Sequence, residues 1–329
     1  MFCFIEFLRA IATMLIANSH FKGVYPNDIL SFGGGLGLAL FYMISGYLLV
    51  NIDDRSRFAT WYGKKIICLF VPLYIVRIIE LAFNKITVRS FGQFVKLFIF
   101  PGSWFGGSML ILYIIYYVFV KYCYRKSRKN ALMSFLIFLV TGYVILFLSS
   151  SPIAFFSLED LTIHEFGIET PYVISQFIWL QCMILGIYLR NHLCIKKGLS
   201  QMANLALAFF NILLFMIIKL IIINGTHHSI EILLGVSYTG FAFFLFRCFM
   251  ASEDLCKKIG KHLPGKAIYL ISACSLEIYY VQFLWIHALK DMIFPLNLIA
   301  LVITITVTAY IVHRLSNCVI EKIMKKSFS

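Results

Sequence analysis

Two residues with acid–base or anion-binding chemistry stand in an apolar run near the start of the chain, FLRAIATMLIANSH. They are Arg9 and His20, eleven positions apart. At about 100° per residue this spacing is roughly 20° more than three full turns, so both lie on one face of a helix. The rise of about 1.5 Å per residue separates them by roughly 16 Å along the axis.

Glu6 lies three residues before Arg9 on the same face and can pair with it. An ionisable group within a bilayer costs several kcal/mol, so such groups usually face the protein interior and mark function. Paired charges at one end and an imidazole at the other suit chemistry that reaches across a membrane. The plain alternatives are an Arg9 that extends to the interface and a His20 that caps the helix.

The composition identifies a membrane protein. Hydrophobic residues make up 61% of the 329 positions and charged residues 13%, against about 45–50% and about 25% in soluble domains. No loop is long enough for a soluble domain, so residues 1–329 are expected to form one membrane-embedded domain. The first apolar run lacks a basic leader and a cleavage site, so we expect it to be retained as a helix.

The expected fold is all-α and polytopic. A bilayer core of about 30 Å needs roughly 20 apolar residues per helix. Ten such windows predict about ten transmembrane helices, at about 2–21, 31–51, 66–83, 103–122, 131–150, 171–190, 202–223, 230–250, 269–289 and 293–315. Segment 91–102 is read as an interfacial or re-entrant piece.

The net charge of +14 fits a membrane topology without a nucleic-acid partner. If both termini are cytoplasmic, most Lys and Arg residues fall in the inner loops, as membrane proteins prefer. The outer loop 151–170 carries four carboxylates and neither Lys nor Arg. It is either a solvated loop or a lip over an outward-facing cleft.

The nine cysteines are scattered, without a C-x-x-C pair, so we expect neither a disulfide framework nor a zinc site. His227 and His228 are adjacent and would point in different directions on a helix, which disfavours a metal site there.

Four motifs together resemble the acyltransferase-3 family of integral membrane O-acyltransferases. They are IEFLRAIA (Ile5 to Ala12) with a histidine eleven residues after its arginine, FYMISGYLL (Phe41 to Leu49), SWFGG with Trp104, and SLEIYYVQ (Ser275 to Gln282). The resemblance implies an acyl-CoA co-substrate, most often acetyl-CoA, with no bound cofactor. It also implies an envelope saccharide or lipid-linked saccharide as acceptor, and a location in the bacterial cell membrane.

In such an enzyme His20 is the expected general base, because histidine commonly deprotonates a hydroxyl at neutral pH. Arg9, held by Glu6, would position the donor or stabilise the thioester oxyanion. The separation of roughly 16 Å favours donor positioning.

Further substrate-binding candidates come from the other motifs and from charge at the inner rim. Ser45 could bind within the site or permit close helix packing beside Gly46. Glu277 is expected to pair with Arg247 or Lys219, or to contact the acceptor. Cys68 and Leu69 stand where the family often has an arginine, for which Arg77 could substitute, and Gln282 stands where a histidine is common. The remaining candidates are Lys64, Lys65 and Trp104.

Two other functions remain open from the sequence. A transporter or flippase for a lipid-linked saccharide or small solute also needs many helices and sparse buried charge. Such proteins often show repeat symmetry and paired broken helices, and the sequence shows neither. A structural membrane subunit would leave Arg9 and His20 freely replaceable.

Overall fold

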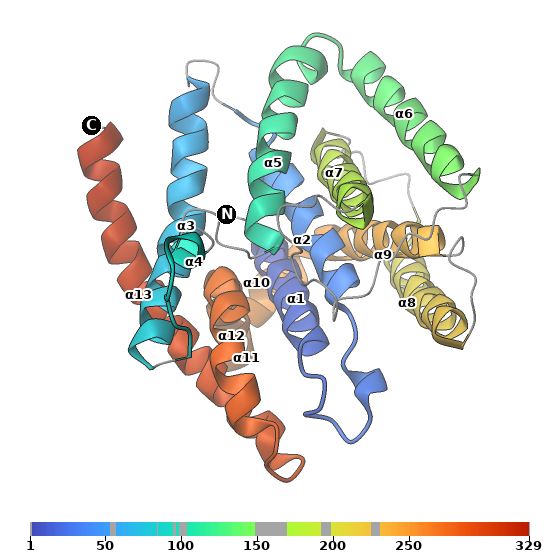
Figure 1. Ribbon diagram of the computed structural model, residues 1–329. Helices are drawn as coiled ribbons and strands as arrows, with labels where there is room; N and C mark the ends of the chain where they lie inside the picture. Colours follow the sequence, from blue (N-terminus) through green and yellow to red (C-terminus); the bar gives the residue numbers. More distant parts are fainter. Residues whose placement is uncertain are drawn as a thin grey trace. The chain divides into compact units, whose positions relative to one another are not determined.

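The computed structural model describes residues 2–52, 57–83, 85–94, 97–98, 104–148, 170–191, 199–224 and 231–328. Every regular element among them is a helix (Figure 1), which confirms the all-α fold class. The elements are α1 (Cys3–Ser19), η1 (Asp28–Leu30), α2 (Gly34–Leu49), α3 (Phe58–Ala82), α4 (Phe91–Phe94), α5 (Trp104–Val118), η3 (Phe119–Tyr124), α6 (Arg128–Leu148), α7 (Thr170–Asn191), α8 (Gln201–Asn224), α9 (Glu231–Ala251), α10 (Glu253–Gly260), α11 (Leu263–Ala273), α12 (Ser275–Leu289) and α13 (Leu296–Phe328).

The chain divides into two compact units. The first comprises residues 1–37, 53–115 and 254–329, and the second comprises residues 38–52 and 116–253. Helix α1, which contains Glu6 and Arg9 and is followed directly by His20, belongs to the first unit.

In the first unit α12 packs against α13, α1 and α3. The core between these helices is apolar and includes Val281, Leu301 and Ala309, all three without exposed surface. Polar contacts also join these helices. One is the indole of Trp285, which donates to the Thr308 hydroxyl at 3.0 Å.

Helices α11 and α12 form one bent pair. Their axes meet at 81° across a break at Cys274, whose φ of −92° and ψ of 16° leave the α-helical region. Neither Gly nor Pro stands at the break, within the sequence ISACSLE (271–277). The sequence predicted one helix over 269–289, and the structure divides this window at Cys274.

In the second unit α8 and α9 form a closely packed pair. Ser237 of α9 donates to the Asn211 carbonyl of α8 at 2.7 Å. Helices α2 and α7 also approach closely, at Gly46 and Gly186: a Cβ on Gly46 would overlap the Met183 backbone. Tyr116 donates to the Gly46 carbonyl at 2.7 Å.

Each of the ten predicted windows corresponds to a helix among the described residues, with the ninth divided between α11 and α12. Five helical segments there are long and apolar enough to cross a membrane, and the bent pair would make six. Helix α1 is short, with 17 residues, and α3 carries Lys64, Lys65, Arg77 and Glu80. The number of about ten spans and the cytoplasmic termini remain predictions.

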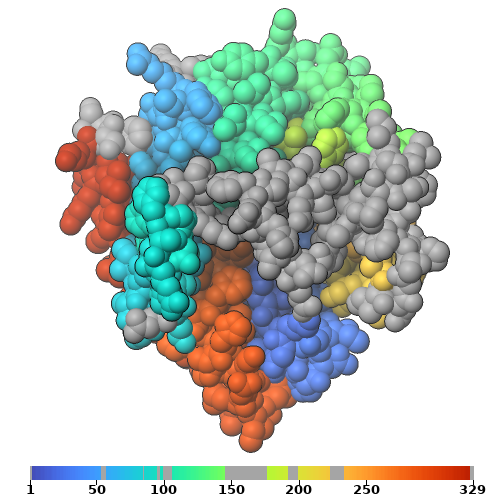
Figure 2. All heavy atoms as spheres, in the orientation of Figure 1, coloured from blue at the N-terminus to red at the C-terminus, as the bar shows by residue number. Residues whose placement is uncertain are grey.

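The segment predicted to be interfacial begins with the short helix α4, whose Phe91 is 79% exposed. Residues of this region, coloured cyan, are visible on the face shown in Figure 2. A membrane position for α4 remains a prediction.

The close approach at Gly46 leads to a stability prediction. Gly46→Ala places a methyl group against the backbone of α7, which cannot rotate away, so we expect a loss of about 1–3 kcal/mol of unfolding free energy. Thermal unfolding of the detergent-solubilised protein measures it. Gly92→Ala is the matched control, because the nearest atom to a Cβ there is Ser90 Oγ at 3.9 Å. Equal stability of the two variants would contradict the prediction.

Candidate active site

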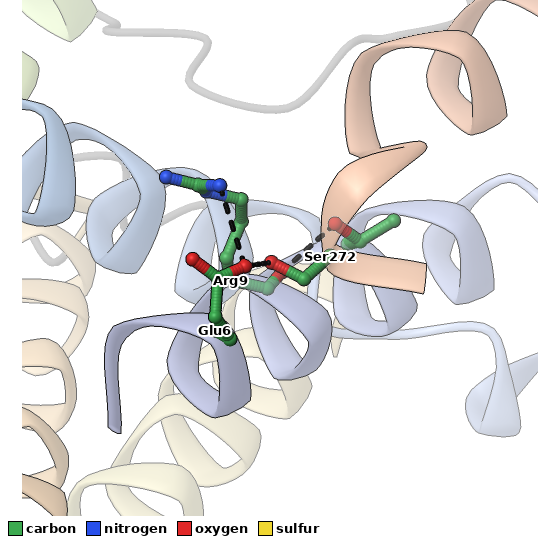
Figure 3. Close-up of polar contacts among 4 residues, drawn as sticks. Glu6, Arg9 and Ser272 are labelled. Atoms are coloured by element: carbon green, nitrogen blue, oxygen red, sulfur yellow. Dashed lines mark hydrogen bonds and ion pairs between the residues drawn. The ribbon is translucent and has the colours of Figure 1, made fainter. Parts of the chain in front are cut away.

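The polar group at the N-terminal end of α1 consists of Glu6, Arg9 and Ser272 (Figure 3). The Ser272 hydroxyl, on α11, donates to Glu6 Oε2 at 2.5 Å. Arg9 Nη1 lies 3.6 Å from the same oxygen. Glu6 and Ser272 are both buried, so this contact joins α1 to α11 inside the protein.

The predicted pair of Glu6 and Arg9 is therefore present, with a third member that the sequence did not reveal. Glu6 stands in the first turn of α1, where a negative charge is favoured by the helix dipole. Nearby, Phe7 packs edge-on against Tyr269 of α11, with ring centroids 6.2 Å apart. The helices are thus held by both an apolar and a polar contact.

One oxygen of the Glu6 carboxylate is left over. Oε1 is buried and accepts no hydrogen bond from the residues that the structure describes. A buried acceptor without a donor costs free energy comparable to its desolvation, so native structures rarely keep one without a reason.

His20 ends α1 at the other end of the same face. Its ring contacts Phe283 and Tyr279 of α12, with centroid distances of 5.0 and 6.3 Å. Among the described residues, none forms a hydrogen bond with the His20 side chain. Because α1 is a continuous helix from Cys3 to Ser19, the axial separation of roughly 16 Å from Arg9 follows.

Both ends of this face meet the same bent pair: Glu6 contacts α11 through Ser272, and His20 contacts α12. The break at Cys274 lies between those two contacts in the chain. The α11–α12 pair therefore contacts both ends of the α1 face.

Asn18 orders the loop that follows α1. Its amide donates to the carbonyls of Leu30 and Phe32 at 2.7 and 3.0 Å, and its oxygen accepts from the Tyr25 hydroxyl at 2.6 Å. Burial raises the pKa of Tyr25. Asn18, which is two residues before His20, therefore holds this loop against the end of α1.

Glu277 has a different partner from those expected. Its carboxylate accepts from His313 Nδ1 of α13 at 3.0 Å, and Asn317 Nδ2 lies 2.9 Å from His313 Nε2. The Asn317 amide donating to Nε2 would leave the proton on Nδ1, facing the carboxylate. The proposed partners Lys219 and Arg247 instead lie over the rings of Phe215 and Phe243, at 6.0 and 5.8 Å.

His313 was overlooked although it carried a readable signal. It is an ionisable residue within the tenth apolar window, the kind of position that marks function or a buried pair. Ser272 carried no such signal, because serine is common in membrane helices and its partner is 266 positions away.

The three basic candidates on α3 have different surroundings. Arg77 Nη1 lies 2.6 Å from Glu80 Oε2, as an ion pair one turn apart. Lys65 is half-buried with Nζ 5.9 Å from the Trp61 ring centroid, and Lys64 is exposed. A donor phosphate near Arg77 would have to share its guanidinium with Glu80.

The three remaining candidates are Ser45, Gln282 and Trp104. Ser45 donates to the Phe41 carbonyl of its own helix at 3.0 Å, and its neighbour Gly46 makes the close packing that was the alternative reading. Gln282 of α12 is fully buried, and neither atom of its amide has a partner within the described part of the chain. Trp104 begins α5, and its side chain lies outside what is described.

Two further sequence features fall outside the described residues: the acidic loop up to Glu169, and His227 with His228. Among the residues described, no group of three His, Cys, Asp or Glu side chains is placed to hold a metal ion.

The Glu277 contact yields a second stability prediction. His313→Ala leaves a buried carboxylate without its donor, so we expect a loss of at least about 1–3 kcal/mol. Asn317→Ala, at an exposed position, should cost much less. Replacing both members, with Glu277→Met and His313→Leu, should recover most of the loss because no unpaired charge remains. Thermal unfolding in detergent distinguishes the variants, and equal costs for His313→Ala and Asn317→Ala would refute the assignment.

Comparison with known proteins gives one match. The family model described as an acyltransferase domain, Acyl_transf_3, matches residues 3–313. Neither a curated protein nor a solved structure matches the chain.

Proposed function

The chain belongs to the acyltransferase-3 family, and from this premise we propose that it transfers a short acyl group from acyl-CoA to a hydroxyl of an envelope saccharide. Acetyl is the proposed acyl group. The proposed location is a bacterial cell membrane, with the saccharide free or lipid-linked. The enzyme class follows from the family, and the substrates and residue roles are our proposal.

The observation that carries the proposal is the face of α1. Arg9 and His20 lie on it roughly 16 Å apart, and each end meets one half of the α11–α12 pair. Such a spacing matches a donor that arrives from one side of the membrane and an acceptor from the other. A residue pair that touched one atom together would need to be much closer.

His20 is the proposed general base. It takes the proton of the acceptor hydroxyl, and the hydroxyl oxygen forms a bond to the thioester carbonyl carbon. The tetrahedral intermediate then collapses, the carbon–sulfur bond breaks and coenzyme A leaves as the thiolate, which takes up a proton. Tyr279 and Phe283, whose rings contact the imidazole, are proposed to stack against a sugar ring of the acceptor.

Arg9 is the proposed donor-binding cation. Its planar guanidinium suits a phosphate group, and Glu6 fixes its position. Lys64, Lys65 and Arg77 are further candidates for the phosphates of coenzyme A, with Ser45, Trp104, Glu277 and Gln282 proposed to contact the acyl group or the acceptor. The buried, unpaired amide of Gln282 is the strongest of these for an acceptor hydroxyl.

One observation favours a second candidate, transport of a saccharide or small solute. The bend of 81° between α11 and α12 is a feature of transporter binding sites. Transporters usually carry such a break in each of two repeats, whereas one bent pair is found among the described residues. Acyl transfer remains the better supported proposal.

The His20 role is tested by substitution. We expect His20→Ala to lower acylation of the surface glycan by about 100-fold or more, because the hydroxyl loses its base. Mass spectrometry of glycan from cells expressing each variant measures the mass of one acyl group per modified residue. His287→Ala is the matched control, since His287 is an exposed histidine of α12.

Membrane insertion of each variant is checked by immunoblot of the membrane fraction. Unchanged acylation in His20→Ala would refute the base. A mutant that blocks saccharide export without changing its acylation would favour the transporter.

A further inference from the structure

We propose that Glu6 Oε1 is a receptor for the pantetheine arm of the acyl donor, and that Ser272 is the residue that holds this oxygen in place. The inference rests on the proposed function, which supplies acyl-CoA as the donor. It adds a second point of donor recognition beside the Arg9 cation.

The first step is that the two oxygens of the Glu6 carboxylate have different surroundings. Oε2 receives both the Ser272 hydroxyl at 2.5 Å and the Arg9 guanidinium at 3.6 Å. Oε1 is buried and receives nothing from the described residues. A pair formed only to neutralise charge would present both oxygens to the guanidinium, in the two-pronged geometry that arginine prefers.

The second step is the role of Ser272. This side chain has no exposed surface, and Glu6 is 8% exposed. A hydroxyl fixed on α11 holds Oε2 on one side, which fixes the direction of Oε1 as well. Arg9, whose side chain is 21% exposed, stays more accessible. The group thus offers an oriented acceptor next to a cation (Figure 3).

The third step is the ligand chemistry that such a group selects. It requires an N–H or O–H donor near an anion. The pantetheine arm carries two amide N–H groups and a hydroxyl, and it continues directly into the pyrophosphate of coenzyme A. One amide or hydroxyl on Oε1 and one phosphate on Arg9 would satisfy both, and the hydrogen bond would be charge-assisted.

The test compares binding of two probes to the full-length protein in lipid nanodiscs by isothermal titration calorimetry. Acetyl-CoA carries the pantetheine arm, and 3′-phospho-ADP is its nucleotide half without that arm. Ser272→Ala should weaken acetyl-CoA binding by about tenfold, because a charge-assisted hydrogen bond loses its geometry, and should leave 3′-phospho-ADP binding unchanged. Glu6→Ala should do the same or more to acetyl-CoA.

Arg9→Lys should weaken both probes, since both contain the phosphates. Ser237→Ala is the matched control: Ser237 is also a fully buried helix serine that bonds a neighbouring helix, through the Asn211 carbonyl. It should change neither affinity. If Glu6→Ala does not fold, Ser272→Ala alone decides the matter.

The outcomes separate the two proposals. Wild-type protein that binds neither probe would overturn the acyl-CoA donor, and this inference with it. Wild-type protein that binds acetyl-CoA while Ser272→Ala binds it equally well would overturn this inference alone and leave Glu6 as a structural partner of Arg9. A loss of both probes in Ser272→Ala would mean that Ser272 merely supports the fold, which also refutes the specific role.

Discussion

Burial of the Glu6 carboxylate is the constraint on which the site depends. A charged group in an apolar bundle is tolerated only with partners that replace water. Arg9 provides the opposite charge and Ser272 provides a hydroxyl. Because the hydroxyl comes from α11, the need to satisfy one carboxylate also fixes the packing of α1 against the bent pair, and with it the position of His20 against α12.

A second buried carboxylate with a partner lies on the other side of the break. Glu277 lies three residues after Cys274 and is satisfied by His313 of α13. Two buried carboxylates thus lie near the bend: Glu6 of α1 accepts from Ser272 of α11, and Glu277 of α12 accepts from His313 of α13. Each ties a half of the bent pair to a different neighbour, which explains how an 81° change of direction is held without proline or glycine.

The sequence predicted the helices well because hydropathy is a local property. The first window, 2–21, became a helix from Cys3 to Ser19, and the pairing of Glu6 with Arg9 followed from helical spacing. The partners Ser272 and His313 were missed because they depend on contacts between distant segments. The bend was missed because its sequence contains no residue that breaks a helix, so only packing reveals it.

The ordered loop beside His20 has a consequence for ligand affinity. Asn18 fastens the backbone at Leu30 and Phe32, and Tyr25 is fastened to Asn18. This loop therefore lost its conformational entropy during folding, before any molecule binds beside the imidazole. Binding there avoids most of the ordering cost that a loose rim would impose, about 0.5–1.5 kcal/mol for each immobilised side chain, which favours the binding of a ligand that makes only weak contacts.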